Sequence, residues 1–274
     1  MPGFICSTCG TQYPPSESPP AHCPVCMDER QFIPPEGQSW TTLERLRISH
    51  HNGFRQYEPG LIGIGTTPKF AIGQRALLVR TPEGNILWDC ISLIDDATIA
   101  IINGLGGLRA IAISHPHFYT TLVDWSRAFG DVPVYLHADD ADWVRQPDDC
   151  IRFWQGETHE LMNGVTLVRG GGHFPGGAML HWAAGAGGKG VVCSADMAIA
   201  NLDRKSFAFM RSIPNFIPLS ENAVRAVAAA LMPFAFDRVY SHHWERVIDS
   251  GAKQVLQDSV DRYVAAIGGA YDRA

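Results

Sequence analysis

Between residues 108 and 120 the chain reads Leu108-Arg-Ala-Ile-Ala-Ile-Ser-His115-Pro-His117-Phe-Tyr-Thr120, an apolar, β-like run that ends abruptly in two histidines. Three other β-like runs also end in metal-type ligands. They are Val165–Arg169 before Gly170-Gly-Gly-His173, Gly190–Ala195 before Asp196, and Arg238–Ser241 before His242-His243. Ligand sites in open α/β sheets lie just outside strand ends, so these side chains can converge although they are far apart in sequence. The pattern predicts a catalytic-type metal site for zinc or iron.

The composition limits the class of protein. With 274 residues, 46% of them hydrophobic, the chain can bury a sizeable core in one or two domains. The formal net charge of −6 gives no electrostatic reason to expect nucleic acid or anionic membrane as a partner. No apolar stretch approaches the roughly 20 residues of a membrane span, and the N-terminus lacks the regions of a signal peptide.

The seven cysteines, four of them in paired CxxC motifs, suit a reducing compartment better than a disulfide framework. We therefore expect a cytoplasmic protein that acts on a small-molecule substrate, without nucleic acid or membrane as partner. The sequence leaves the oligomeric state open.

The first 35 residues predict a small separate module. The motifs Cys6-Ser-Thr-Cys9 and Cys23-Pro-Val-Cys26 can close a tetrahedral four-sulfur site. A segment this short cannot fold on apolar burial alone, so its metal is expected to supply the folding free energy. Pro34-Pro35-Glu36-Gly37 reads as a linker to a large domain over residues 36–274. We expect that loss of the four-cysteine metal unfolds residues 1–35 and leaves the large-domain metal in place.

The metal of this module is zinc or iron. The segment from Phe4 to Phe32 resembles the short rubredoxin-like module of rubrerythrins as well as plain zinc ribbons. Iron would make it an electron carrier, and zinc a structural element. Structural zinc is favoured, because four-cysteine sites are most commonly closed zinc sites.

The remaining sequence mixes strands and helices. This mixture favours an α/β sandwich over a doubly wound dinucleotide fold, because no GxGxxG motif follows a strand and opens a helix. A segment with an acidic start at Asp139-Asp-Ala-Asp142 is expected to begin a helix after the strand Val132–His137. The other expected elements are a hairpin (Phe70–Arg80 with Asn85–Cys90) and helices at Ile94–Leu105, Thr120–Phe129, Ser220–Leu231 and Ala252–Ile267.

The order of these motifs is similar to that of the metallo-β-lactamase superfamily over about residues 40–260. The resemblance implies an α/β fold, the metallo-β-lactamase αβ/βα four-layer sandwich, here preceded by the four-cysteine ribbon. It also implies a structural role for Asp89 before the first helix. By position, it implies that the metal ligands of the large domain are His115, His117, His173, the bridging carboxylate Asp196, and His242.

The chain departs from the family pattern at one point. The family reads HxHxDH, whereas this chain has Tyr119 at the position of the aspartate and Thr120 at that of the last histidine. Neutral Tyr and Thr are poor zinc ligands, so the resemblance predicts a mononuclear site. Asp124, one helical turn further on, could replace a missing ligand. Whether His242 or His243 approaches the metal is left open.

The leading functional prediction is a metal-dependent hydrolase that uses a metal-bound hydroxide on an ester, thioester, lactone or amide. Asp196 would orient that hydroxide or accept its proton, and Tyr119 would be a wall residue or a proton donor. His242 would also take part in catalysis, either by approaching the ion or by hydrogen-bonding its water. One alternative is a mononuclear non-haem Fe(II) oxidoreductase of the persulfide dioxygenase type, with His115, His173 and Asp196 as its ligands. A second alternative is a non-catalytic binding protein on the same fold.

Overall fold

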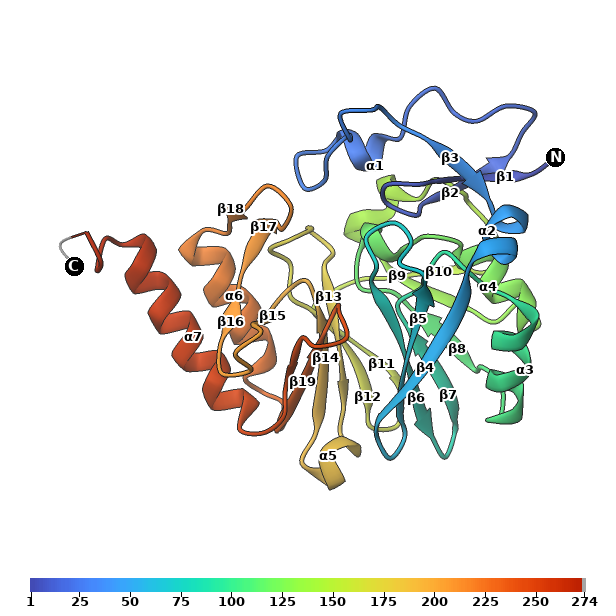
Figure 1. The fold of residues 1–274 in the computed structure, drawn as a ribbon. Coiled ribbons are helices and arrows are strands. Elements are labelled where there is room, and N and C mark those ends of the chain that lie inside the picture. Colours follow the sequence, from blue (N-terminus) through green and yellow to red (C-terminus); the bar gives the residue numbers. More distant parts are fainter. Residues whose placement is uncertain (273–274) are drawn as a thin grey trace. The chain divides into compact units, whose positions relative to one another are not determined.

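The computed structural model describes residues 1–272 and divides into two compact units, Met1–Trp154 (unit 1) and a second unit that begins at Gln155 (unit 2; Figure 1). Each unit contains β-sheets and helices, in agreement with the predicted α/β class. The expected boundary after residue 35 stays a prediction. Within residues 1–272, every helix is too short or too polar to cross a membrane.

Unit 1 contains a three-stranded sheet in the order β2-β1-β3 and a seven-stranded sheet in the order β10-β9-β8-β7-β6-β5-β4. The strands are β1 (Gly3–Cys6), β2 (Gln12–Pro15), β3 (Trp40–Thr42), β4 (His51–Glu58), β5 (Leu61–Thr67), β6 (Arg75–Thr81), β7 (Gly84–Trp88), β8 (Ala110–Ala112), β9 (Val134–His137) and β10 (Ile151–Trp154). The helices are α1 (Pro24–Met27), α2 (Leu43–Ser49), α3 (Asp96–Gly104), α4 (Leu122–Ala128) and the 3₁₀ helices η1 (Pro116–Phe118) and η2 (Ala138–Trp143).

Local sequence explains most of these elements. The β6–β7 hairpin and helices α3 and α4 form where they were expected, and the Asp95 side chain caps α3 by accepting a hydrogen bond from the Thr98 amide. The acidic segment after β9 differs from the prediction, because it forms the 3₁₀ helix η2 and not an α-helix. The His137 ring accepts a hydrogen bond from the Asp139 amide there. Pro147 disfavours helical backbone at Gln146, which limits how far a helix could extend from this segment.

Unit 2 contains a six-stranded sheet in the order β11-β12-β13-β14-β19-β20 and two small two-stranded sheets, β15-β16 and β17-β18. The strands are β11 (Thr158–Met162), β12 (Val165–Arg169), β13 (Ala178–Trp182), β14 (Val191–Ala195), β15 (Ile199–Ala200), β16 (Phe207–Ala208), β17 (Met210–Ser212), β18 (Ile217–Pro218), β19 (Arg238–Ser241) and β20 (Val247–Ile248). The helices are α5 (Gly185–Gly188), α6 (Glu221–Leu231) and α7 (Ala252–Ile267).

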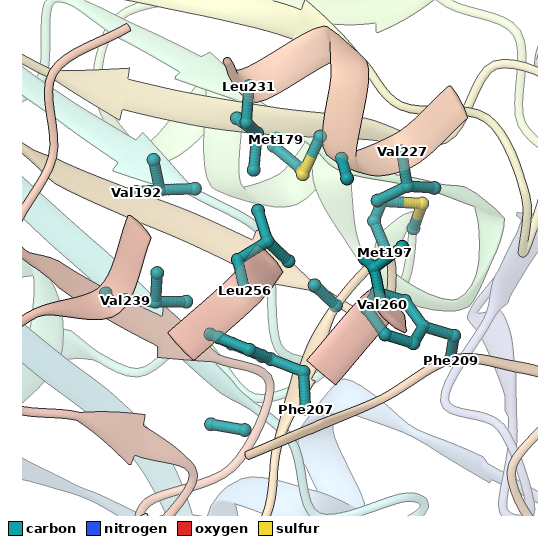
Figure 2. Packing of buried hydrophobic residues seen from close by; sticks show 14 of the residues in the cluster. Met179, Val192, Met197, Phe207, Phe209, Val227, Leu231, Val239, Leu256 and Val260 are labelled. Atoms are coloured by element: carbon teal, nitrogen blue, oxygen red, sulfur yellow. The ribbon is translucent and has the colours of Figure 1, made fainter. Parts of the chain in front are cut away.

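Helices α6 and α7 pack against one face of the six-stranded sheet. The predicted N-cap Ser220 accepts a hydrogen bond from the Ala223 amide at the start of α6. Burial of an aliphatic side chain between these helices and the sheet contributes about 1.5–3 kcal/mol to stability, so the helices hold the strands in place. The buried side chains shown in Figure 2 include Val227 and Leu231 of α6, Leu256 and Val260 of α7, and Val192 and Val239 of the sheet.

Strand direction decides where the predicted ligands lie. In unit 2, β12 and β14 are both antiparallel to β13, and β19 is parallel to β14, so the three strands run the same way and end at one edge. In unit 1, β7 and β8 are parallel neighbours, which brings their carboxyl ends together. The strands predicted before each ligand motif are therefore confirmed, and each unit collects its ligand candidates at one sheet edge.

Candidate metal centres

His115 and His117 follow β8 in unit 1, with Pro116 between them, and both side chains are buried. The ring of His115 is fixed by a hydrogen-bond chain. The Asp89 carboxylate accepts hydrogen bonds from the Ser114 amide (2.8 Å) and the Ser114 hydroxyl (2.7 Å), and Ser114 Oγ lies 2.9 Å from His115 Nδ1. Since the one hydroxyl proton goes to the carboxylate, Ser114 Oγ accepts from His115 Nδ1–H. The lone pair of His115 is then on Nε2, in the tautomer of a metal ligand.

The hydrogen-bond chain on His115 leads to a first expected result. Ser114→Ala removes the acceptor for Nδ1–H, and metal affinity at the histidine site should fall about 10- to 100-fold, the usual cost of losing a group that orients a ligand. Competition with a calibrated chelator measures the affinity, and Ser126→Ala, which removes a hydroxyl that donates to the Val132 carbonyl (2.6 Å), is the matched control. An unchanged affinity in Ser114→Ala would show that Asp89 and Ser114 do not orient His115.

Two residues beside the His115 motif have unusual backbone angles. Asp89 has φ of +65° and Thr120 has φ of +34°, a region that non-glycine residues seldom adopt. Ala195 in unit 2, directly before Asp196, also has a positive φ of +45°. Such strain persists only where the surroundings hold it, and it is common at functional sites. The three strained residues lie at the ends of β7, η1 and β14, next to the candidate ligands. Strain there is consistent with a backbone that fixes the direction of the ligand side chains.

Tyr119 and Thr120, which the sequence resemblance places at the positions of two second-site ligands, make contacts within unit 1. The Tyr119 hydroxyl donates to the Asp140 carbonyl (3.4 Å), and burial, with a smaller effect of the Asp140 carboxylate, raises the pKa of Tyr119 well above its usual range. The Thr120 carbonyl accepts a hydrogen bond from the Gln12 amide (3.1 Å). Asp124 is half-buried on α4. These contacts give Tyr119 a structural role, and its catalytic role stays a prediction.

In unit 2, His173, Asp196 and His242 lie together at the carboxyl edge of the sheet. The Met210 carbonyl lies 3.0 Å from His173 Nδ1 and can only accept, so Nδ1 carries the proton and Nε2 the lone pair. Asp196 Oδ2 lies 3.8 Å from that Nε2, and Asp196 Oδ1 lies 2.8 Å from His242 Nδ1. His242 therefore contacts the carboxylate, while His243 packs edge-to-face on His242, with ring centroids 4.3 Å apart.

The glycines before His173 are needed for the turn. Gly171 and Gly172 have φ of +63° and +76°, and a Cβ at Gly172 would lie 3.0 Å from the Leu219 side chain. Only glycine adopts this backbone without strain and leaves that space. The turn thus directs His173 back to the sheet edge that carries Asp196.

The four cysteines of the two CxxC motifs form one buried cluster in unit 1. The Sγ atoms of Cys6 and Cys26 are 3.6 Å apart, as are those of Cys9 and Cys23. A tetrahedral ion with metal–sulfur bonds of about 2.3 Å requires sulfurs about 3.8 Å apart, so the cluster has the size of a metal tetrathiolate. The sequence prediction of one four-cysteine group is confirmed at the level of geometry.

Tyr13 and Trp40 cover this cluster. Their rings meet edge-to-face, with centroids 5.2 Å apart, and pack against the cysteine side chains. Hydrogen bonds among the four thiols shift their pKa values in opposite directions. The pKa of Cys23 is held well below its usual range, chiefly by Cys26, and the pKa of Cys26 is raised well above it, chiefly by Cys23. A stabilised thiolate is the form that binds a metal ion.

Sequence reasoning missed two residues that orient the candidate ligands. Ser114 acts through its side chain, and a serine directly before a strand-end histidine was a visible signal. Met210 acts through its backbone carbonyl, which leaves no trace in the residue type. Asp89, by contrast, was assigned its structural role from the resemblance.

Comparisons with known proteins agree with this fold. The solved structure of DIM-1 metallo-β-lactamase exposed to ceftazidime has a TM-score of 0.58 at 12% identity and covers 78% of this chain and 98% of its own. The structure of VMB-1 at pH 5.5 has a TM-score of 0.57 at 13% identity and covers 79% and 98%. The chain therefore has the metallo-β-lactamase fold that the sequence predicted, and at these identities the likeness shows the fold alone.

A relative in sequence places the chain in a family. The uncharacterized protein YmaE of Bacillus subtilis (strain 168) is 45% identical over 269 residues, which is 97% of each protein. The chain belongs to the same family as YmaE. No protein-family model matches the chain.

Proposed function

We propose that the protein is a metal-dependent hydrolase with a single ion, and that His115, His117, His173 and Asp196 are its ligands. The observation that carries the proposal is the hydrogen bond on Nδ1 of both His115 and His173. In each ring this bond leaves Nε2 as the ligand atom, which is how metal-binding histidines are held. A zinc ion bound there would supply Lewis acidity and lower the pKa of a coordinated water to about 7.

The chain's own residues would then handle the proton. Asp196 is buried between His173 and His242, and its carboxylate can orient an attacking water and accept its proton. His242 Nδ1, 2.8 Å from Asp196 Oδ1, fixes that carboxylate and can share the proton. His242 is thus proposed to act through Asp196, with direct contact to the ion as the alternative.

The class of substrate follows from the ligands that are missing. Tyr119 and Thr120 supply no carboxylate or imidazole, so a two-metal clamp on a phosphodiester is disfavoured, as is β-lactam hydrolysis as the physiological reaction. Esters, thioesters, lactones and amides need one activated water and remain the proposed substrates. The net charge of −6 disfavours a polyanionic substrate such as nucleic acid.

We assign structural zinc to the four-cysteine cluster. Four buried thiolates at tetrahedral spacing leave no position for substrate, which is typical of closed structural sites. Iron in the same cluster would instead indicate electron transfer.

Metal analysis of protein purified without added metal tests the proposal. We expect zinc at the histidine site, and metal-dependent hydrolysis of at least one member of an ester, thioester, lactone and amide panel. Iron at the histidine site with oxygen consumption on a persulfide would establish the oxidoreductase alternative. A histidine site that binds no added zinc, iron or manganese would overturn the enzyme assignment and favour a binding protein.

A further inference from the structure

We infer that the four-cysteine site positions the histidine-bearing turn of unit 1, so that binding of its metal controls metal affinity at His115 and His117. The affinity part of this inference rests on the proposed function. The positioning part rests on contacts inside unit 1 alone.

The chain directly after the first CxxC motif contacts the two loops that carry the candidate site. The Gln12 amide donates to the Thr120 carbonyl (3.1 Å), three residues beyond His117. The Gly10 carbonyl accepts from the Ser92 hydroxyl (3.0 Å), in the loop that begins with Asp89. A Cβ at Gly10 would collide with that hydroxyl, so the approach is close. The cysteine module thus contacts both the histidine turn and the Asp89 loop.

The histidine turn needs such support. Thr120 is β-branched and has φ of +34°, a strained conformation for such a residue. It persists only where neighbouring contacts hold the backbone. The Gln12 hydrogen bond is one of these contacts, and the bond from the Thr121 hydroxyl to the Ser92 carbonyl (3.0 Å) is another.

The position of Gln12 in turn depends on the cysteine cluster. The Cys6 amide donates to the Thr11 carbonyl (2.9 Å), and the Gly10 amide donates to the Cys6 carbonyl (2.8 Å), which closes a turn around the first two ligands. The Cys9 thiol donates to the Thr11 hydroxyl (3.3 Å). Without the metal ion, the four buried thiols are no longer bound to one atom, and small domains of this kind unfold when their metal is removed. Residues 10–12 would then release Thr120 and Ser92.

Further contacts join residues 1–35 to the rest of unit 1. β3, which lies beyond the linker, pairs with β1, and Ile5 packs with Leu46 and Leu93 in one buried cluster. Loss of the four-cysteine metal should therefore extend beyond residue 35. In this respect the module acts as a support for the histidine turn.

A pair of substitutions at Gln12 distinguishes the effect of its backbone hydrogen bond from the effect of its side chain. Gln12→Pro removes the amide proton that Thr120 accepts and keeps all four cysteines, whereas Gln12→Ala keeps the amide. In Gln12→Pro we expect faster amide hydrogen exchange in the peptide covering residues 115–121 and about tenfold weaker zinc binding at the histidine site, as for other contacts that orient ligands. Gln12→Ala should match the wild type in both measurements.

A second pair removes the cysteine metal itself. Cys9→Ser should raise exchange in residues 115–121 and weaken zinc binding at the histidine site, while Cys150→Ser, a buried thiol outside the cluster, should do neither. Adding a thiol-directed mercurial to the wild type tests the same step without a substitution. Wild-type exchange in residues 115–121 after proven loss of the cysteine metal would overturn the inference. Raised exchange in a protein that never binds metal at the histidines would instead support the positioning and contradict the proposed function.

Discussion

His173→Ala should lose the ion of the histidine site and keep the ion of the four-cysteine site. The substitution removes one of three imidazoles, and its ligand atom is the Nε2 that the Met210 hydrogen bond leaves unprotonated. Loss of a group that merely orients a ligand costs about 10- to 100-fold in affinity, so loss of the ligand itself should cost more than about 100-fold. Hydrolytic kcat/KM should fall in parallel. Metal analysis after dialysis against a weak chelator measures the result.

His181 offers a matched control for this result. It is also a buried histidine of unit 2, and its Nε2 donates to the Ala235 carbonyl (2.8 Å), but it pairs with Thr166 at the start of β12, at the end of the sheet opposite to His173. His181→Ala should lower stability to a similar degree and retain the histidine-site ion. Stoichiometric metal at that site in His173→Ala, with the fold intact by circular dichroism, would show that His173 is not a ligand.

The sequence predicted the parts of the fold that depend on local pattern. The strands before His115, His173, Asp196 and His242 formed where apolar runs ended in ligands, because such runs favour buried strands. Helix α7 matches its predicted range at both ends. The assignment of η2 failed because a short acidic segment is compatible with either helix type, and the cap from His137 was not visible in the residue pattern.

The sequence could not predict contacts made by the backbone. The bonds from Gln12 to Thr120 and from His173 to Met210 join segments far apart in the chain, and each involves a main-chain group that every residue possesses. The change in composition at Pro34-Pro35 indicated a separate module. The contacts of residues 10–12 with loops of the seven-stranded sheet were not visible in the sequence. The sequence reveals the candidate ligands because their side chains are of metal-binding types. It does not reveal the main-chain hydrogen bonds that hold several of these ligands in position.

The number of ions at the histidine site distinguishes this chain from a two-metal enzyme, and we expect one ion even in excess zinc. The Tyr119 hydroxyl donates to the Asp140 carbonyl, and Thr120 carries no imidazole, so both residues lack the ligand chemistry of a second site. Asp196 and His242 contact each other and are too few to bind a second ion alone. Asp124, on the first turn of α4, is the acidic residue that the sequence offers as a replacement ligand.

Anomalous scattering at the zinc edge measures the number of ions directly. Crystals grown with and without excess zinc should both show a single peak that contacts His115, His117 and His173. Two peaks about 3.5–4 Å apart, the spacing of two-metal sites, would contradict the mononuclear site. If the second peak contacted Asp124, the Asp124→Asn variant should abolish it and leave the first, because the neutral amide is a much weaker zinc ligand than a carboxylate. A single peak at the histidines in both crystals, beside the separate peak of the four-cysteine site, would support the loss of the second site at Tyr119 and Thr120.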